Sequence, residues 1–267
     1  MGSGFVVSPS LDYNSVRVMS LRIVFLGTSA AVSSNKRDNT SLLIDDVLID
    51  CPGNVFGKMI KAGYDPLKLR TIIITHRHVD HAYGLPSLLE MLRLSGKKEP
   101  LKICINEDFF FEMRQILSVY GLIREDFPLE MAPIRVDGCV LFEDSLRIET
   151  FAVKHSVPNF GLKFSTSSAY VVYTSDTEPC EEVIEQAKNA DLLIHEATCA
   201  ETMTGRKEGH SCVEDAARIA KQAGVKNLCL VHLGLELEEH LCELTRTAEE
   251  IFNGRIIVPE DLDRVIV

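Results

Sequence analysis

The feature that most constrains this chain is the segment His76–His81, which reads HRHVDH and directly follows the apolar run TIIIT. Such a run is typical of a buried strand, so the segment should leave a sheet at a strand end. Residues two apart in an extended chain face the same way, so His76 and His78 can bind one metal ion. Asp80 and His81 lie where the chain turns into a helical pattern and can face a second ion. Four candidate ligands within six residues predict a metal site and outweigh the alternative of a polar loop with chance histidines.

Three further candidate ligands follow strand-like runs elsewhere in the chain. His155 comes after FAVK, Asp176 after YVVYTS and His232 after LCLV. Taken singly, each would more often be a structural residue, but together with HRHVDH they complete the ligand sets of two ions. The expected sets are His76, His78 and His155 in one site and Asp80, His81 and His232 in the other. Because a carboxylate has two oxygens, Asp176 can bridge the sites. Imidazole and carboxylate ligands favour two zinc ions, with manganese as the alternative.

Short apolar runs alternate with helical patterns along most of the chain. Hairpin patterns mixed with β–α alternation favour an α/β fold with two sheets and helices outside them. The expected strands are 21–26, 41–44, 47–50, 71–75, 101–105, 139–142, 146–153, 191–195, 227–231, a hairpin over 161–174 and a terminal strand pair. The expected helices are 54–63, 85–94, 107–119, 180–189, 212–223 and 239–252. We expect residues 19–267 to form this one domain. Residues 1–18 should be an N-terminal extension, partly foreign to the natural chain, because Met19 would make a natural start.

Composition limits the classes of function. The apolar fraction of 46% excludes a disordered chain. A formal net charge of −11 argues against a strongly basic nucleic-acid binder, although it does not exclude a local basic patch. No apolar run approaches the roughly 20 residues of a membrane span. The eight Cys occur singly, without a CxxC pair. We interpret them as buried free thiols in a reducing compartment and expect a cytoplasmic protein.

The order of these motifs resembles the metallo-β-lactamase superfamily: HRHVDH, then a lone His155, a lone Asp176 and a last His232 after a strand. The resemblance implies a four-layer αββα sandwich with a dinuclear site at one edge. It also gives a role to Asp50 in LLIDDVLIDCPG, which matches an early Asp that braces the site rather than binding metal.

Three longer segments narrow the resemblance. HRHVDHAYGLPSLL, LLIHEAT and EGHSCVEDAARIAKQAGVKNLCLVHL are similar to ribonuclease Z, the tRNA 3′-processing endonuclease, and the likeness extends over about residues 21–260. It implies a homodimer and a Glu196–His210 pair that helps to protonate the leaving oxygen. A ribose alkoxide is a poor leaving group, so a His tuned by a carboxylate is a sensible general acid. We interpret His195 as a buried structural donor and His240 as solvent-facing.

Several features depart from ribonuclease Z. That family carries a long arm between the lone His and the lone Asp, which grips the tRNA elbow. Here only 20 residues lie between His155 and Asp176, so we expect no arm. After His232 the family continues with a Ser and an Arg, whereas this chain reads LGLE, and GHSC replaces GHST. The basic residues left near the motifs are Arg77, Lys154, Arg206 and Lys207. Because cations capture phosphate, these changes weaken the expectation of tRNA more than that of phosphodiester chemistry.

We therefore expect a dinuclear zinc phosphodiesterase of the ribonuclease Z-like branch, acting on an RNA 3′ end or a small phosphodiester. The nucleophile would be a metal-bound hydroxide that is ionised near neutral pH. Asp80 would orient or deprotonate it, and His210 with Glu196 would protonate the leaving oxygen. One alternative is a hydrolase of this fold that acts on a non-phosphate ester or a lactam, which the segments LLIHEAT and GHS disfavour. A second is a non-catalytic nucleic-acid-processing scaffold, which the full ligand set disfavours. A third is an iron oxygenase, which would ordinarily use a mononuclear site.

Overall fold

The computed structural model describes residues 20–138 and 140–267, so Met19, Cys139 and the expected N-terminal extension lie outside it. Within these ranges the strands form two seven-stranded sheets. The first sheet has the order β14 (Arg264–Ile266), β1 (Arg22–Gly27), β2 (Ser41–Ile44), β3 (Val47–Ile49), β4 (Thr71–Ile74), β5 (Leu101–Asn106) and β6 (Leu129–Ile134). The second has the order β13 (Arg255–Ile257), β12 (Asn227–Val231), β11 (Leu192–Glu196), β10 (Tyr170–Tyr173), β9 (Phe160–Ser165), β8 (Leu146–Ala152) and β7 (Val140–Glu143).

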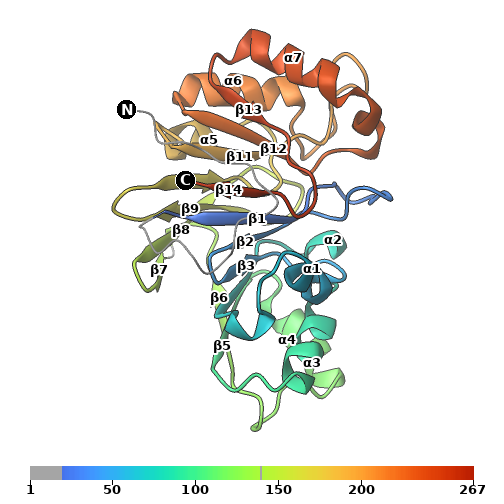
Figure 1. Ribbon diagram of the computed structural model, residues 1–267, viewed down its shortest axis with the longest axis vertical. Coiled ribbons are helices and arrows are strands. Elements are labelled where there is room, and N and C mark those ends of the chain that lie inside the picture. Colours follow the sequence, from blue (N-terminus) through green and yellow to red (C-terminus); the bar gives the residue numbers. More distant parts are fainter. Residues whose placement is uncertain (1–19, 139) are drawn as a thin grey trace.

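The helices lie outside the two sheets (Figure 1). On the side of the first sheet these are α1 (Val55–Lys61), α2 (Val79–Ala82), α3 (Leu85–Leu94) and α4 (Phe110–Val119), with a 3-10 turn, η1 (Pro66–Lys68). On the side of the second sheet they are α5 (Glu181–Gln186), α6 (Val213–Ala223) and α7 (Leu241–Ile251), preceded by η2 (Leu235–His240). Among the described residues, no helix is both long and apolar enough to cross a bilayer.

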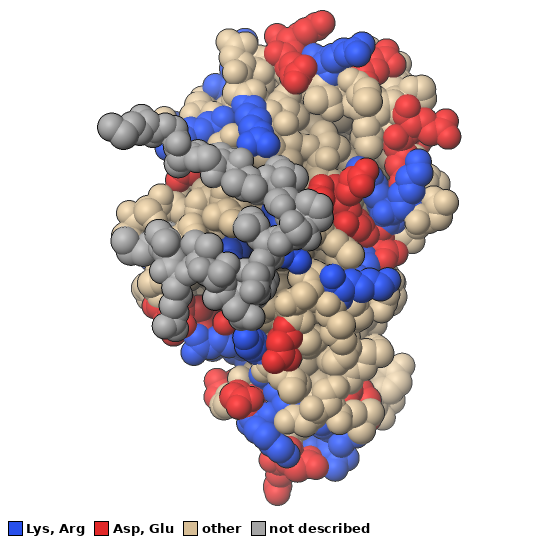
Figure 2. All heavy atoms as spheres, viewed as in Figure 1, with Lys and Arg blue, Asp and Glu red and all other residues tan. Residues whose placement is uncertain are grey.

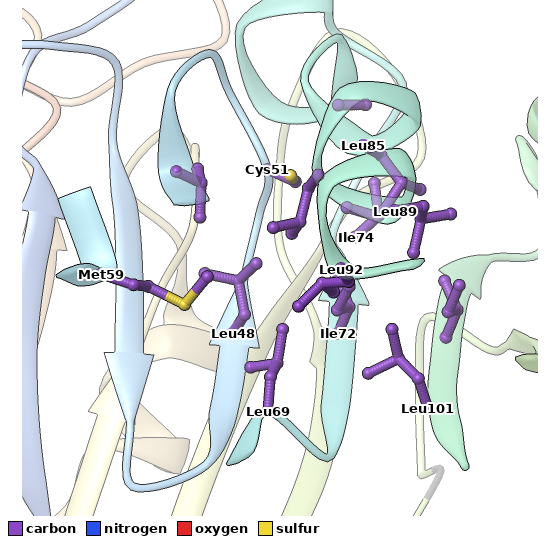
Figure 3. Close-up of a cluster of buried hydrophobic side chains, with 14 of the residues drawn as sticks. Leu48, Cys51, Met59, Leu69, Ile72, Ile74, Leu85, Leu89, Leu92 and Leu101 are labelled. Carbon is purple, nitrogen blue, oxygen red and sulfur yellow. The ribbon is translucent and has the colours of Figure 1, made fainter. Parts of the chain in front are cut away.

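Three hydrophobic layers hold the four structural layers together. Strand β4 shows how the alternation works: Ile72 and Ile74 belong to the cluster between the first sheet and its helices, whereas Ile73 belongs to the cluster between the sheets. Figure 3 shows Ile72 and Ile74 packed against Leu85, Leu89 and Leu92 of α3. A third cluster joins the second sheet to α5, α6 and α7. Side chains two apart on a strand share a face, so one apolar run serves two cores. The predicted αββα sandwich is confirmed.

Two expectations about strands are wrong. The sequence predicts no strand near residue 130, yet β6 pairs in parallel with β5 at the edge of the first sheet. Its exposed, Pro-containing sequence LEMAPI lacks the apolar signal of a buried strand, and an edge is where a strand tolerates Pro. The last two strands also do not pair with each other. β13 joins β12 in the second sheet and β14 joins β1 in the first, so the end of the chain ties the two sheets together.

The expectation of free thiols is wrong at two positions. Cys199 and Cys212 form a disulfide across 13 residues of sequence, with Cα atoms 4.2 Å apart. Cys51, Cys104, Cys180, Cys229 and Cys242 are free, and of these only Cys51, Cys104 and Cys229 are buried. The sequence contains no sign of the bond, because two segments separated by a loop place these sulfurs together in space. Burial raises the pKa of the Cys51 thiol far above its usual range, which fits an unreactive core residue.

Candidate active site

The predicted ligands meet where strands of both sheets end. His76–His81 runs from the end of β4 into α2, on the side of the first sheet. His155 follows β8, Asp176 follows β10 and His232 follows β12, all in the second sheet. His232 has a φ of 53°, a left-handed conformation that a non-glycine residue adopts only when its surroundings impose it. The packing of the two sheets therefore brings together residues that lie far apart in sequence.

The first predicted ligand set forms one cluster of ring nitrogens. His78 Nδ1 lies 3.1 Å from His76 Nε2 and 3.1 Å from His155 Nε2. Donor atoms bound to one tetrahedral zinc ion at about 2.0–2.1 Å lie about 3.3 Å apart, so the observed separations match a shared ion. His155 is oriented by its other nitrogen, because Nδ1 donates to the carbonyl oxygen of Gly209 at 2.6 Å. This hydrogen bond to a backbone carbonyl fixes the tautomer that leaves Nε2 free for a metal.

The second predicted set lies beside the first, with Asp176 between them. Asp80 Oδ2 is 3.5 Å from both His81 Nε2 and His232 Nε2. Asp176 Oδ2 is 3.4 Å from His81 Nε2, 3.3 Å from His232 Nε2 and 3.8 Å from His76 Nε2. One carboxylate thus faces nitrogens of both sets, which is the position required of a bridging ligand.

Asp50 has the predicted bracing geometry. It is fully buried, and its Oδ2 accepts a hydrogen bond from His81 Nδ1 at 2.7 Å. Its carboxylate also accepts bonds from the backbone N–H and the hydroxyl of Thr75. Asp50 therefore turns His81 so that Nε2 faces Asp80 and Asp176. Among the described residues, Asp50 belongs to none of the groups that could hold a metal ion.

Electrostatics in the cluster favour a bound cation. Burial opposes charge on His81, yet the carboxylates of Asp176 and Asp50 raise its pKa well above the usual value. Burial would raise the pKa of Asp176, but His232 and His81 hold it well below the usual value. Burial lowers the pKa of His76, helped by the neighbouring charge of His81, so a neutral ring is available there.

Two buried ligand atoms also lack a hydrogen-bond partner among the described residues, Asp176 Oδ1 and His232 Nε2. Burying a polar atom without a partner is costly, so these two atoms indicate a missing ligand. The neutral ring of His76, ionised carboxylates and unpartnered donor atoms together fit a metal centre.

Glu196 and His210 form the hydrogen-bonded pair that the resemblance implies. His210 Nδ1 lies 2.8 Å from Glu196 Oε1, and the His210 side chain is 20% exposed whereas Glu196 is buried. The His210 ring stacks on the ring of His232, with centroids 5.5 Å apart. Burial lowers the pKa of His210, but the hydrogen bond and charge of Glu196 outweigh it, so the pKa is raised overall. A partly exposed His with a raised pKa, at the edge of a cluster that could hold metal, is suited to give a proton away.

Thr198 is a site residue that the sequence did not predict. Its hydroxyl donates to Glu196 Oε2 at 2.7 Å and lies 2.9 Å from His232 Nδ1, which places it as an acceptor there. The same oxygen is 3.2 Å from His210 Nδ1. Thr198 thus connects the Glu196–His210 pair to a metal-ligating candidate and leaves His232 Nε2 free. A Thr after a strand does not by itself indicate a functional residue. The available signal is that Thr198 ends the segment LLIHEAT, which resembles ribonuclease Z.

Glu178 is a second site residue that the sequence did not predict. Its Oε1 accepts a hydrogen bond from Gly209 N at 2.9 Å, and Gly209 in turn orients His155. Gly209 has a φ of 79°, and a Cβ there would lie 3.2 Å from His155 Nδ1. Only glycine meets both demands comfortably.

The remaining predicted histidines behave as expected. His195 is fully buried, and its Nδ1 bonds to the carbonyl oxygen of Glu196 at 2.7 Å. The side chain of His240 is 47% exposed. Within the part of the chain that the structure describes, neither belongs to a group of residues that could hold a metal ion.

The basic residues near the motifs are already paired with carboxylates. The pairs are Arg77 with Asp108 (3.5 Å), Lys154 with Glu178 (2.5 Å), Arg206 with Asp215 (2.7 Å) and Lys207 with Glu236 (2.5 Å). Glu236 belongs to the LGLE stretch that departs from ribonuclease Z, so the departure adds an acid that neutralises one of these cations. On the face drawn in Figure 2, acidic and basic side chains are interspersed rather than gathered by sign.

The arm of ribonuclease Z is absent from the stretch where it is expected. Between His155 and Asp176, a stretch that the structure describes throughout, the chain forms only β9 and β10. These two strands pair with each other in register from Tyr170–Ser165 to Tyr173–Leu162. The segment therefore belongs to the second sheet and projects nothing comparable to an arm.

Comparison with known proteins agrees with this fold and with the resemblance of the sequence motifs. The family model for the Beta-lactamase superfamily domain matches residues 46–233. The ribonuclease Z of Methanothermobacter thermautotrophicus is 30% identical, over 80% of this chain and 86% of that protein.

Two solved structures share the fold. The metallo-beta-lactamase fold protein YhfI from Bacillus subtilis has a TM-score of 0.80 at 23% identity, over 93% of this chain and all of that one. Human tRNase Z, short form, has a TM-score of 0.73 at 22% identity, over 91% and 98%. With its His and Asp cluster at the ends of strands from both sheets, the chain belongs to the metallo-β-lactamase superfamily and, within it, is a ribonuclease Z-like metal-dependent hydrolase.

Proposed function

We propose that this protein is a dinuclear zinc phosphodiesterase that favours small phosphodiesters over pre-tRNA. The observation that carries the proposal is that six candidate ligands form two sets, with the carboxylate of Asp176 near both: His76, His78 and His155 in one, and Asp80, His81 and His232 in the other. The His210–Glu196 pair lies beside them, and a His210 ring nitrogen is also within 4.8 Å of ligand atoms of Asp176 and His232. Ligands for two ions and a separate proton donor are the parts that phosphodiester hydrolysis with a poor leaving group needs.

Each part of the cluster has a chemical task in this proposal. When bound, two zinc ions would supply a water ionised near neutral pH and a Lewis acid for the phosphoryl oxygen. One ion would be held by His76, His78 and His155, and the other by His81 and His232. The carboxylate of Asp176 would bind both ions. Asp80 is ionised, because His232 and His81 outweigh the effect of burial and lower its pKa. It would therefore bind metal and also orient or deprotonate the attacking water.

The proton for the departing oxygen would come from His210. Its ring is partly exposed, and its Nδ1 is held by Glu196, which leaves Nε2 to face a substrate. Glu196 is fixed in turn by four hydrogen bonds, from Thr177 N, Thr198 N, Thr198 Oγ1 and His210 Nδ1. Such a preorganised carboxylate stabilises the charged imidazole without rearranging during the reaction.

This arrangement predicts a pH dependence. His210 acts as an acid only when protonated, so kcat/KM on a poor leaving group should be full below its pKa and fall as pH rises through it. In Glu196→Gln the charge that raises this pKa is lost, so the descending limb should move to lower pH. The measurement is a pH profile of both proteins on an alkyl phosphodiester, with metal content checked. A limb that stays in place would exclude His210 as the titrating acid.

The proposed preference for small substrates follows from the electrostatics. Affinity for nucleic acid comes largely from cations on phosphates, and its salt dependence reports their number. Here the cations near the site are paired with acids, the arm is absent and the net charge is −11. We expect efficient hydrolysis of a cyclic nucleotide or an aryl phosphodiester, and slow, weakly specific cleavage of pre-tRNA. The test compares kcat/KM for the three substrates at about physiological salt. A much higher value for pre-tRNA, cut at its 3′ boundary, would identify a true tRNA processor.

The homodimer of the family is part of the proposal, and exposed apolar side chains support it. Tyr83 after α2, Leu94 on α3 and Tyr120 after α4 are 53%, 69% and 68% exposed. A hollow of about 420 Å³ includes two of these side chains and is lined by Tyr83, Pro86, Ser87, Glu90, Tyr120 and Leu122. Exposed apolar surface of this kind marks contact sites, and a second copy of the chain is the occupant we propose.

Light scattering or sedimentation checks this point. The wild-type protein should be a dimer at micromolar concentration, and Tyr120→Glu should shift it towards monomer because a charge would enter the interface. Phe142→Glu is the matched control, since Phe142 is 64% exposed on β7 at the edge of the second sheet. A wild-type monomer, or equal effects of both variants, would contradict the assignment.

A further inference from the structure

The Cys199–Cys212 disulfide lies beside the Glu196–His210 pair, both along the chain and in space. Cys199 directly follows Thr198, and Cys212 is two residues after His210. Both Cys residues are fully buried. Around the bond the two segments run parallel for one bridge, with Val213 N donating to Cys199 O at 2.8 Å and Cys199 N to Ser211 O at 3.4 Å. The disulfide thus joins the segment that carries the carboxylate to the segment that carries the imidazole.

The two joined segments are anchored very differently. Glu196 ends strand β11, which pairs on both sides with β10 and β12, and Ala197 N continues the ladder to Val231 O at 2.9 Å. His210 belongs instead to residues 201–211, which form turns between β11 and α6. Its backbone N–H donates to Lys207 O at 3.2 Å, within the same turn segment. The carboxylate is therefore fixed by the sheet, whereas the imidazole lies on a turn segment that is held by separate contacts, among them Gly209 N to Glu178 Oε1 at 2.9 Å.

We propose that the Cys199–Cys212 disulfide positions the proton donor: it holds the turn segment with His210 against the end of β11, so that the acid-dependent part of the activity requires the bond to be intact. This inference rests on the proposed role of His210. Cys199 and Cys212 are positioning residues and touch no substrate. Ser211 Oγ, which donates to Thr177 O at 2.7 Å, also holds the segment. Loss of the disulfide should therefore shift His210 without destroying the site.

Reduction by a dithiol provides a direct way to open this connection. One thiolate of the dithiol attacks a Cys sulfur, the protein S–S bond breaks, and a mixed disulfide forms. The second thiolate of the reagent then releases the protein sulfur and closes the reagent to a cyclic disulfide. Two electrons pass to the protein and two sulfurs gain protons. Because both sulfurs are buried, the reaction should require opening of the exposed turn at 202–206.

The experiment uses the zinc-loaded protein, its dithiothreitol-treated form, Cys199→Ala/Cys212→Ala, and Cys242→Ala as a matched control at an exposed free thiol. Alkylation before and after reduction, followed by peptide mapping, establishes whether Cys199 and Cys212 are bonded. Each protein is then assayed on an alkyl and on a nitrophenyl phosphodiester, with zinc content and Tm recorded. We expect the reduced form and the double variant to lose about ten-fold in kcat on the alkyl diester. On the nitrophenyl diester they should lose less than about two-fold, with zinc unchanged.

His210→Ala separates the possible failures. If His210→Ala loses activity equally on both substrates, the proposed acid fails and the inference fails with it. If His210→Ala is selective but the double variant is not, the disulfide is structural only and the inference alone is overturned. Labelling of Cys199 and Cys212 without reduction would overturn it as well. Should the double variant fold poorly, the dithiothreitol-treated wild-type protein decides, because its fold is formed before the bond is cut.

Discussion

An Asp176→Ala variant is expected to lose both metal ions and, with them, roughly 10³-fold or more of the proposed phosphodiesterase activity, since water is ionised near neutral pH only when a metal ion lowers its pKa. The reason is the shared position of this carboxylate, which lies within 4.8 Å of ligand atoms in both sets. His232→Ala should instead weaken mainly the site of Asp80 and His81. Metal analysis of the purified variants, with the wild-type protein expected to hold two ions per chain, measures this directly.

A half-buried Asp outside the site provides the control for this variant. Asp191 precedes β11 and pairs with Lys226 at 2.6 Å, at the end of the strand opposite to Glu196. Asp191→Ala should therefore keep both ions even if its Tm falls. The bridging arrangement would be refuted by a fully active wild-type preparation that contains a single ion per chain, or by an Asp176→Ala protein that still binds two.

The second large effect concerns the proton donor. His210→Ala should lose on the order of 10²–10⁴ in rate on an alkyl phosphodiester, because an alkoxide leaves only with a proton. The loss should shrink on a nitrophenyl diester, whose leaving group is stable as an anion. Metal content should stay at the wild-type level, because the two predicted ligand sets are complete without His210, although a His210 ring nitrogen lies within 4.8 Å of ligand atoms of Asp176 and His232.

His240→Ala is the matched histidine control, since that side chain is exposed at the end of η2. It should behave as the wild-type protein on both substrates. Equal losses on both diesters in His210→Ala would point to a role in holding phosphate, and a parallel loss of metal would make His210 a ligand.

The cluster of His and Asp residues could be predicted from the sequence because its densest part is local. His76, His78, Asp80 and His81 lie within six residues, and the other ligands each follow a strand whose apolar pattern is clear. Strand periodicity places such residues at a sheet end without any knowledge of which strands are neighbours. For the same reason the two-sheet architecture could be inferred from mixed hairpin and β–α patterns.

What the sequence did not predict depends on contacts between distant segments. The disulfide forms because Cys199 and Cys212 meet across a turn, and no rule of cysteine spacing predicts this meeting. The pairing of β13 and β14 with different sheets depends on tertiary neighbours rather than on the strands themselves. Thr198 and Glu178 have ordinary side chains whose importance comes from what they touch. Local patterns thus identify ligands well and their supporting residues poorly.

The origin of the ligands in two separate sheets has a thermodynamic consequence. The first sheet supplies His76–His81 and the bracing Asp50, whereas the second supplies His155, Asp176 and His232. Neither sheet alone offers all the candidate ligands, so bound ions would select chains in which the two layers have docked. A ligand that binds only the docked state stabilises it by about 2.7 kcal/mol at one hundred times its Kd. Zinc would therefore act as a clamp between the layers, and the metal supply of the cell would help to set how much of the protein is fully assembled.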